Sequence, residues 1–178
     1  MASHDALTGL LNHAYAKKRI LERIETRPTA SFALVIFDLD HFKSANDTYG
    51  HAFGDQVLVH LAEKLRQCIR GGDIAARAGG DEFLIFLEYK DEVETVISRI
   101  FQSLGGQFEQ FPLSISMGVA LTERVTGGYD VLFHAADAAL YTVKRGGRGH
   151  YRFYDDSMRE TLSVISPIED GGDAPEDV

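Results

Sequence analysis

The sequence predicts an α+β fold in which helices cover an antiparallel, ferredoxin-like sheet. Three observations support it: an apolar run of strand length at 31–39, two strand-like runs joined by glycines within 73–89, and amphipathic helical segments between and after them. In chain order the elements read α-β-α-α-β-β-α-β-α-β. Without the outer elements a βαββαβ core remains, which is the ferredoxin-like arrangement.

The first half of the chain supplies helices around one buried strand. A stripe of apolar residues at helical spacing spans 11–27. The run SFALVIFDL at 31–39 is almost wholly apolar, which favours a strand buried on both faces. A short helix is expected over 40–50, with Asp40 as a possible N-cap, and a long amphipathic helix follows over 54–72.

The second half supplies the remaining strands. Residues 73–89 read as strand, tight turn and strand, because Gly79 and Gly80 can adopt the positive φ angles of a two-residue hairpin. The other expected elements are a helix, a strand, a helix and a last edge strand, in that order over 91–104, 113–121, 129–147 and 150–155.

Composition and charge limit the class of protein. The chain has 178 residues, 44% hydrophobic and 25% charged, which suits one domain with a real core. Its single cysteine, Cys68, excludes a disulfide framework and a cysteine-cluster metal site. No apolar run approaches the ~18 residues of a membrane segment. No signal peptide is visible, so we expect a cytoplasmic location.

Acidic residues are concentrated at the C-terminus. Residues 169–178 hold five acids and no base within a chain of net charge −9. We therefore expect a solvated, disordered tail over 155–178. An acidic domain binds nucleic-acid backbone poorly, so nucleic acid is not an expected partner.

Carboxylates stand at two strand ends that the predicted topology brings together. Asp38 lies near the end of the buried strand, and Asp81 and Glu82 begin the strand after the glycine turn. The first and third strands of a ferredoxin-like core are central, so these acids should converge. Such a group suits Mg²⁺, which takes one or two protein carboxylates with phosphate and water. The alternative is that Asp38 and Asp40 are turn residues.

The segment after Asp38 suits phosphate. A helix beginning near His41 would direct the amides of His41, Phe42 and Lys43 toward the strand end, where amides and the helix dipole bind phosphate. The Lys43 ammonium adds a mobile positive charge. With the neighbouring carboxylates, this predicts a site for a nucleoside triphosphate and metal ions.

Asn46 and Asp55 are candidate readers of guanine. Asn46 offers a donor and an acceptor, and an ionised Asp55 can accept the two adjacent N–H groups on the Watson–Crick edge of guanine. The alternative is local: Asp55 follows Gly54 near the expected start of a long helix, where an acid favours the helix dipole.

Five segments, in order and spacing, resemble the GGDEF family of diguanylate cyclases: DALTGLLN, FDLDHFKSANDTYGHAFGD, RAGGDEF, SISMGVA and ADAALYTVKRGGR. The resemblance spans about 5–154, which we expect to form one domain after a leader at 1–4. It implies the palm-type sheet of nucleotidyl cyclases. It also implies condensation of two GTP molecules into cyclic di-GMP, with release of two pyrophosphates, by a homodimer that presents one GTP per subunit.

The resemblance implies a role for each matching residue. Two Mg²⁺ or Mn²⁺ ions per active site would be held by Asp38, the carbonyl of Leu39, Asp81 and Glu82. Asp81 would accept the proton of the attacking hydroxyl, Glu82 would assist with the metals, and Lys43 would stabilise charge on the phosphates. Contacts to GTP would come from Phe42, Lys43, Asn46, Asp55, Lys144 and Arg148. For the last two, the alternative is favourable interaction with a helix C-terminus.

RGGD, at 70–73, matches the family's RxxD inhibitory motif. The resemblance implies that Arg70 and Asp73 bind guanines of cyclic di-GMP, with Arg99 as a second arginine. Arginine can bond O6 and N7 of guanine together. The alternative is an ordinary helix end at Gly71 and Gly72. Feedback by the product is therefore expected.

Two positions depart from the family pattern, and other functions stay open. His13 stands where the family commonly has arginine, and Gly149 where it commonly has asparagine. One alternative is a catalytically weak GGDEF domain that binds GTP or cyclic di-GMP as a regulatory module. Another nucleotidyl cyclase or polymerase-type palm, or a pure interaction module, fits the acids and the guanine pair less well. We expect a sensory or receiver region upstream in a bacterial signalling protein.

Overall fold

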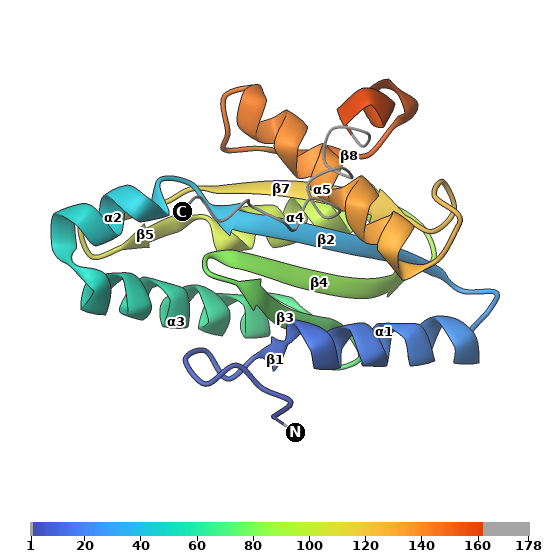
Figure 1. Ribbon diagram of the computed structural model, residues 1–178, viewed down its shortest axis with the longest axis horizontal. Coiled ribbons are helices and arrows are strands. Elements are labelled where there is room, and N and C mark those ends of the chain that lie inside the picture. The colour runs from blue at the N-terminus through green and yellow to red at the C-terminus, as the bar shows by residue number, and fades with distance from the viewer. Residues whose placement is uncertain (1, 162–178) are drawn as a thin grey trace, which may run out of the picture.

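The structure, a computed structural model, describes residues 2–161 as a mixed α+β domain (Figure 1). The strands of this part are β1 (Leu11–Asn12), β2 (Ser31–Leu39), β3 (Ile74–Gly79), β4 (Glu82–Tyr89), β5 (Gly106–Phe108), β6 (Phe111–Leu113), β7 (Ile115–Leu121) and β8 (Tyr151–Phe153). The helices are α1 (His13–Thr26), α2 (Phe42–Tyr49), α3 (His51–Cys68), α4 (Val93–Leu104), α5 (Tyr129–Arg145) and the 3₁₀ helix η1 (Asp156–Met158).

The sheet has the predicted ferredoxin-like core. Its strand order is β1-β3-β4-β2-β7-β8, and β5 and β6 form a separate hairpin. As predicted, strands β2 and β4 are central and antiparallel, and β8 lies at one edge of the sheet. There β8 pairs in parallel with β7. The register of β2 and β4 places Asp38 opposite Glu82. The first and third core strands therefore bring two of the predicted acids together.

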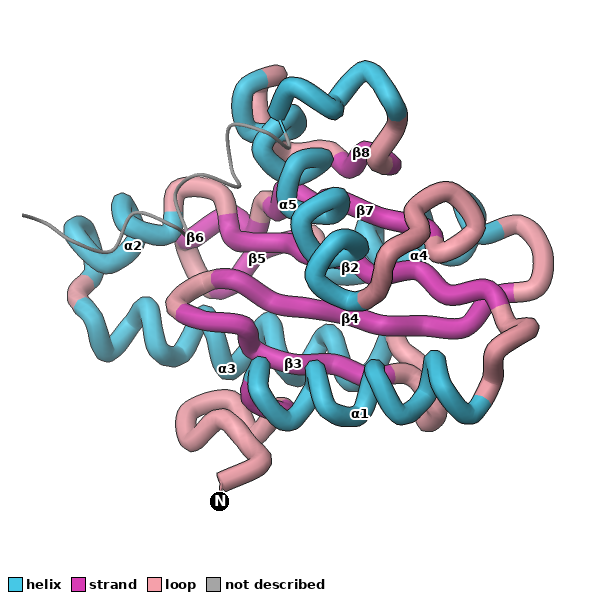
Figure 2. Tube along the Cα trace, turned by 45° about the vertical axis from the view of Figure 1, so that its right-hand side comes forward, coloured by secondary structure: helices cyan, strands magenta, loops and turns pink. Residues whose placement is uncertain are grey.

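Helices cover both faces of the sheet, as Figure 2 shows. Side chains alternate along β2, so Leu34 and Ile36 pack in the cluster with α1 and α5, whereas Val35 and Phe37 pack in the cluster with α3 and α4. All four are fully buried. The apolar run therefore forms a strand with helices on both sides, as its composition predicts.

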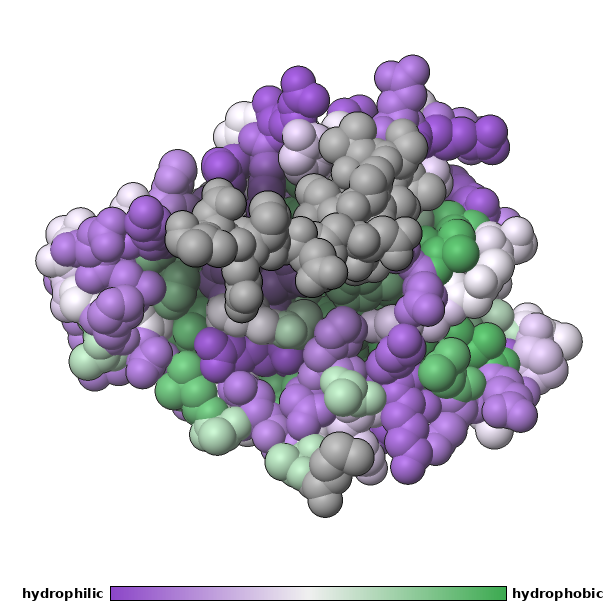
Figure 3. All heavy atoms as spheres, in the orientation of Figure 1, coloured by the Kyte–Doolittle hydropathy of each residue, from purple (hydrophilic) through white to green (hydrophobic). Residues whose placement is uncertain are grey.

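The surface is mainly polar on the face that Figure 3 presents, where hydrophobic side chains appear in separate small groups. Within residues 2–161, none of the helices combines the length and the apolar character that a membrane crossing needs. The largest fully buried hydrophobic side chains belong to the two clusters against the sheet.

The structure differs from the sequence prediction at short elements and at one helix start. Strand β1 and the β5–β6 hairpin were not predicted. Helix α3 begins at His51, directly after Gly50, so Asp55 lies in its second turn and does not cap it. The predicted start at 54 was wrong, because Gly50, with φ of 90°, makes the break between α2 and α3 alone.

The C-terminal part continues beyond the last strand. Residues 155–161 include η1, in which Met158 is buried. The rest of the predicted tail, 162–178, lies outside the described residues, so its expected disorder stays a prediction.

His13, one of the two departures, joins α1 to α5. Its Nε2 lies 2.9 Å from the Tyr129 hydroxyl, and its ring stacks on Phe133 with centroids 5.2 Å apart. Burial first, and the neighbouring Lys17 second, lower the pKa of His13. A neutral imidazole therefore fits this packed position better than a charged side chain.

Candidate active site

Asp38 carries an unsatisfied oxygen at the end of β2. The residue is 6% exposed, and its Oδ2 forms an ion pair with Nζ of Lys144 on α5. Its Oδ1 is buried and has no hydrogen-bond partner within the described part of the chain. Burial raises the pKa of Asp38, an effect that Lys144 opposes and Asp81 adds to. A buried carboxylate oxygen without a donor is the kind of ligand that a cation would satisfy.

Glu82 faces a second acid that the sequence analysis did not include. Its pKa is raised to about 7, first by burial, then by Asp137 of α5 and by Asp38. Asp137 precedes Lys144 by seven residues, so both lie on one face of the helix. That spacing could have identified Asp137 from the sequence. The adjacent ends of β2 and β4 thus concentrate negative charge beside α5, and Lys144 of that helix pairs with Asp38.

The hairpin between β3 and β4 places Asp81 beside these carboxylates. The two turn residues are Gly80 and Asp81, and the predicted pair Gly79-Gly80 was wrong by one position. The cause is an irregular register between Arg77 and Gly79, which carries β3 one residue further. Gly80 has φ of 47°, a left-handed angle at which a residue with Cβ is strained.

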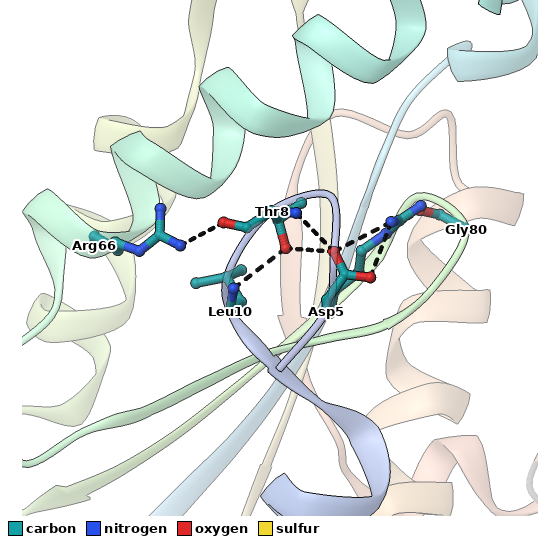
Figure 4. Close-up of polar contacts among 6 residues, drawn as sticks. Asp5, Thr8, Leu10, Arg66 and Gly80 are labelled. Atoms are coloured by element: carbon teal, nitrogen blue, oxygen red, sulfur yellow. Dashed lines mark hydrogen bonds and ion pairs between the residues drawn. The ribbon is translucent and has the colours of Figure 1, made fainter. Parts of the chain in front are cut away.

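Arg77 holds this turn to the N-terminal segment. Figure 4 shows Asp5 and Thr8 of that segment beside Gly80 of the turn. Its Nε donates to the Gly80 carbonyl at 2.8 Å, and its Nη1 lies 3.2 Å from Oδ1 of Asp5. Asp5 also accepts from the amide and hydroxyl of Thr8, at 2.8 and 2.7 Å. Arg66 of α3 donates to the Thr8 carbonyl. This cluster of hydrogen bonds was not predicted from the sequence.

Helix α2 begins at Phe42, and its N-terminus has no side-chain cap. Its first amides are therefore available to an anion. Lys43 is exposed beside them. Asp40, predicted as a possible N-cap, does not cap the helix, because its carboxylate is engaged by Ser114, Ser116 and Gly149. His41 takes the cap position with φ of 61°.

Asn46 and Asp55 come from the two helices that meet at Gly50. The Asn46 Oδ1 atom would lie 1.8 Å from a Cβ on Gly54, so the Asn46 side chain rests against the residue before Asp55. Asp55 is exposed and lines a cavity of about 310 Å³ together with Leu7 and Phe108. The Asn46 side chain thus packs against the start of α3 one residue before Asp55, and glycine at position 54 makes this close approach possible.

The two predicted basic residues stand at the C-terminal end of α5. Lys144 is in the last turn, where it pairs with Asp38. Arg148 is exposed, with φ of 66°, and its amide donates to the Val143 carbonyl at 3.0 Å. The Gly149 amide bonds to Asp40, which keeps this turn beside the end of β2.

The predicted inhibitory residues are partly brought together. The Arg70 amide donates to Oδ2 of Asp73 at 2.8 Å, and both line a cavity of about 470 Å³ with Arg23 of α1 and Arg27, which follows that helix. Arg99 lines a different cavity, between α4 and β8. The pKa of Cys68, raised chiefly by burial, is affected by both Arg99 and Asp73, so these two charges flank one thiol.

The acidic group is too sparse to enclose an ion unaided. Within residues 2–161, no three His, Cys, Asp or Glu side chains converge closely enough to hold a metal.

Comparison with known proteins agrees with this geometry. The sequence model of the family described as "Diguanylate cyclase, GGDEF domain" matches residues 2–150. A bifunctional diguanylate cyclase/cyclic di-GMP phosphodiesterase of Pseudomonas aeruginosa, MucR, is 36% identical over 94% of this chain, which covers 26% of MucR. The chain therefore spans about a quarter of that relative.

Solved structures show the same domain. The GGDEF domain of PA1120 from Pseudomonas aeruginosa superposes with a TM-score of 0.82 and 31% identity, over 90% of this chain and 99% of that one. The GGDEF domain of DgcB from Caulobacter crescentus, solved in complex with c-di-GMP, superposes with a TM-score of 0.75 and 27% identity. The match covers 86% of this chain and 96% of that one. The family match, the shared palm fold and the acids of the hairpin turn agree, and the chain belongs to the GGDEF family.

Proposed function

We propose that this chain is a diguanylate cyclase domain that condenses two GTP molecules into cyclic di-GMP and releases two pyrophosphates. The observation that supports this best is Asp38: a buried carboxylate opposite Glu82, with Oδ1 unsatisfied and Lys144 on Oδ2. A domain that only bound other proteins would gain nothing from such a costly buried arrangement.

The same strand ends would hold the metal ions. The proposed ligands of two Mg²⁺ or Mn²⁺ ions are Asp38, the carbonyl of Leu39, Asp81 and Glu82. When bound, the ions would neutralise negative charge on the phosphates in the transition state. The unsatisfied Asp38 oxygen and the high pKa of Glu82 both indicate carboxylates that gain from a nearby cation.

The chain's own cations and amides would position the triphosphate. The uncapped start of α2, at Phe42 and Lys43, offers amides and one ammonium, and Lys144 and Arg148 approach from α5. Positioning of this kind supplies much of the catalysis in phosphoryl transfer. At the other end of the substrate, Asn46 and Asp55 would bond the guanine edge.

Two copies of the chain are needed, because each carries one GTP site. In the proposed homodimer the 3′-hydroxyl of one GTP attacks the α-phosphorus of the other. A P–O bond forms to that oxygen, the bond to the β-phosphate bridge breaks, and pyrophosphate leaves. Asp81, in the turn, would accept the hydroxyl proton. The step then repeats in the opposite sense to close the ring.

Regulation is proposed at two levels. Because relatives such as MucR are about four times as long as this chain, a sensory or receiver region upstream would bring two domains together. Cyclic di-GMP would bind at Arg70 and Asp73, with Arg99 as a further cation, and would hold the subunits in an unproductive arrangement. This requires tighter binding to the unproductive arrangement than to the productive one.

Product analysis tests the proposal. The purified chain is incubated with GTP and Mg²⁺, and the products are separated by chromatography beside authentic cyclic di-GMP. We expect cyclic di-GMP from GTP, no cyclic dinucleotide from ATP, and almost no cyclic di-GMP from GTP with the Asp81→Ala variant. If the chain binds GTP or cyclic di-GMP tightly yet forms no cyclic di-GMP even at high protein concentration, it is a regulatory binding module instead.

A further inference from the structure

Asp40 joins three separate segments beside the candidate active site. The residue is 2% exposed. Its Oδ2 accepts from the Ser114 hydroxyl at 2.6 Å and from the Gly149 amide at 3.1 Å, and its Oδ1 accepts from the Ser116 hydroxyl at 2.6 Å. Its own amide donates to the Ser114 carbonyl at 2.8 Å. The β2–α2 junction, β7 and the turn after α5 thus meet at one carboxylate.

These contacts explain how a carboxylate can be buried here. An ionised carboxylate loses its hydration on burial, and only hydrogen bonds or a partner charge recover that cost. Asp40 receives three donors, and Ser116, fully buried, also accepts from the Gly149 amide at 3.1 Å. Such a satisfied network has one preferred geometry, so it fixes its members relative to each other.

One side of the network is the turn that carries Arg148. Gly147, Arg148 and Gly149 all have positive φ, at 110°, 66° and 68°. This backbone leaves α5 directly after the basic last turn, and the Asp40–Gly149 bond ties it to the sheet end. Glycine at 149 fits, because glycine and asparagine are the residues that most readily adopt this region.

The other side of the network is the phosphate-binding segment. Asp40 lies two residues after Asp38 and two before Phe42, where the uncapped helix begins. The carboxylate therefore sets the distance between the α2 amides on one side and the Lys144–Arg148 end of α5 on the other. Asn46 and Asp55, further along α2 and α3, have no bond to this network.

We propose that Asp40 is a positioning residue for the triphosphate, acting through the Gly149 turn. It holds the cations of the α5 end and the amides of the α2 start so that both face the same phosphates. The inference rests on the proposed function, because it requires a triphosphate at this place. The proposal predicts different effects on the two parts of the substrate. Binding of the phosphates depends on Asp40, and binding of the base does not.

The test compares GTP with GMP. Calorimetry measures the affinity of the chain for both nucleotides, with Ca²⁺ in place of Mg²⁺ so that turnover does not interfere. Asp40→Ala should weaken GTP binding about tenfold or more and GMP binding about twofold or less, because the lost bonds act on the phosphates. Asp40→Asn should recover most of the affinity, since one oxygen still serves the Gly149 amide and a serine hydroxyl can accept as well as donate.

Two further variants separate positioning from general instability. Ser116→Ala removes one donor to Asp40 and one acceptor of the Gly149 amide but keeps the Asp40–Gly149 bond, and we expect a smaller loss in the same direction. Leu104→Ala, at the buried end of α4, creates a cavity without removing any of these donors or acceptors and should lower the melting temperature while leaving the GTP-to-GMP affinity ratio unchanged. An unchanged ratio in folded Asp40→Ala, or the same change of ratio in Leu104→Ala, overturns the proposal.

Failure of the proposed triphosphate site has a different signature. A chain that binds GTP without forming cyclic di-GMP still allows the affinity test, whereas without that site the parent chain itself would show no preference for GTP over GMP. Amide hydrogen exchange at Gly149 decides the network in that case, because it needs no ligand. Faster exchange in Asp40→Ala than in the parent supports the anchoring of the turn, and equal exchange contradicts it.

Discussion

Arg77 and Asp5 form an ion pair between the glycine hairpin and the N-terminal turn, with Nη1 3.2 Å from Oδ1. The side chains are 17% and 21% exposed, so the pair is largely shielded from solvent. Because Nε of Arg77 also donates to the Gly80 carbonyl, one guanidinium connects the segment that leads into the domain with the turn that carries Asp81. Any movement of the N-terminal turn is thus coupled to the candidate active site.

Arg77→Lys should loosen the hairpin turn. A lysine ammonium cannot reach Asp5 and the Gly80 carbonyl in the fixed fork of a guanidinium. We expect the free energy of unfolding to fall by about 1–2 kcal/mol. We also expect the turnover number for GTP to fall by a larger factor than the one by which the Michaelis constant for GTP changes. Steady-state kinetics and urea unfolding measure both. Arg27→Lys, at the more exposed pair with Glu88, is the control and should change little. Equal effects from the two variants would remove the special role of Arg77.

Glu82 should make the metal-free protein less stable as the pH rises. Its pKa is about 7 when folded, against an ordinary value of 4.5. Because the pKa of Glu82 is higher in the folded than in the unfolded chain, its protonated side chain contributes stability to the fold below pH 4.5. This stability is lost as the pH rises through 7 and the folded-state carboxyl ionises. The loss is roughly 3 kcal/mol at full ionisation, by the conversion of pKa shifts to free energy.

Thermal unfolding with a chelator at several pH values checks this. Glu82→Gln should be stabilised relative to the parent increasingly from pH 4.5 to 7, and Glu88→Gln on the same strand should not. Parallel curves for the parent and Glu82→Gln would mean that Glu82 does not titrate in this range in the folded chain.

Gly54→Ala should displace Asn46 without harming the helix. Position 54 lies within α3 at an ordinary helical angle, where alanine is about 1 kcal/mol more favourable than glycine. The new Cβ would lie 1.8 Å from Oδ1 of Asn46, so that side chain must move. We expect a loss of affinity for GTP but not for ATP, measured by calorimetry. Gly105→Ala, with only ordinary contacts around it, is the control. An equal loss for both nucleotides would exclude Asn46 from base recognition.

Several features of this molecule lie beyond sequence reasoning for physical reasons. The central strands and the meeting of Asp38 with Glu82 follow from hydrophobic pattern and topology, and were predicted. The β5–β6 hairpin has strands of three residues, too short for an alternating pattern. The role of Asp40 depends on partners 74, 76 and 109 residues away, so local rules assigned it a helix cap instead.

Arg70→Ala should relieve feedback while sparing basal turnover. Arg70 and Asp73 line a cavity separated from the hairpin turn by β3, so cyclic di-GMP bound there would not displace GTP. We expect inhibition of the parent that added GTP does not overcome, and loss of cyclic di-GMP binding in Arg70→Ala. Binding of cyclic di-GMP to Arg70→Ala as tight as to the parent would reduce the motif to a helix end. Arg99→Ala, tested beside it, shows whether that cation reaches the same ligand.

The dependence of rate on protein concentration tests the two-subunit mechanism most directly. Initial rates of cyclic di-GMP formation are measured at saturating GTP and Mg²⁺ over a wide range of dilute chain concentrations. Because each chain supplies one GTP and one set of ligands, the rate should rise about as the square of the concentration while most chains are monomers. A rate strictly proportional to concentration throughout, in a chain shown by sedimentation to be monomeric, would contradict the account.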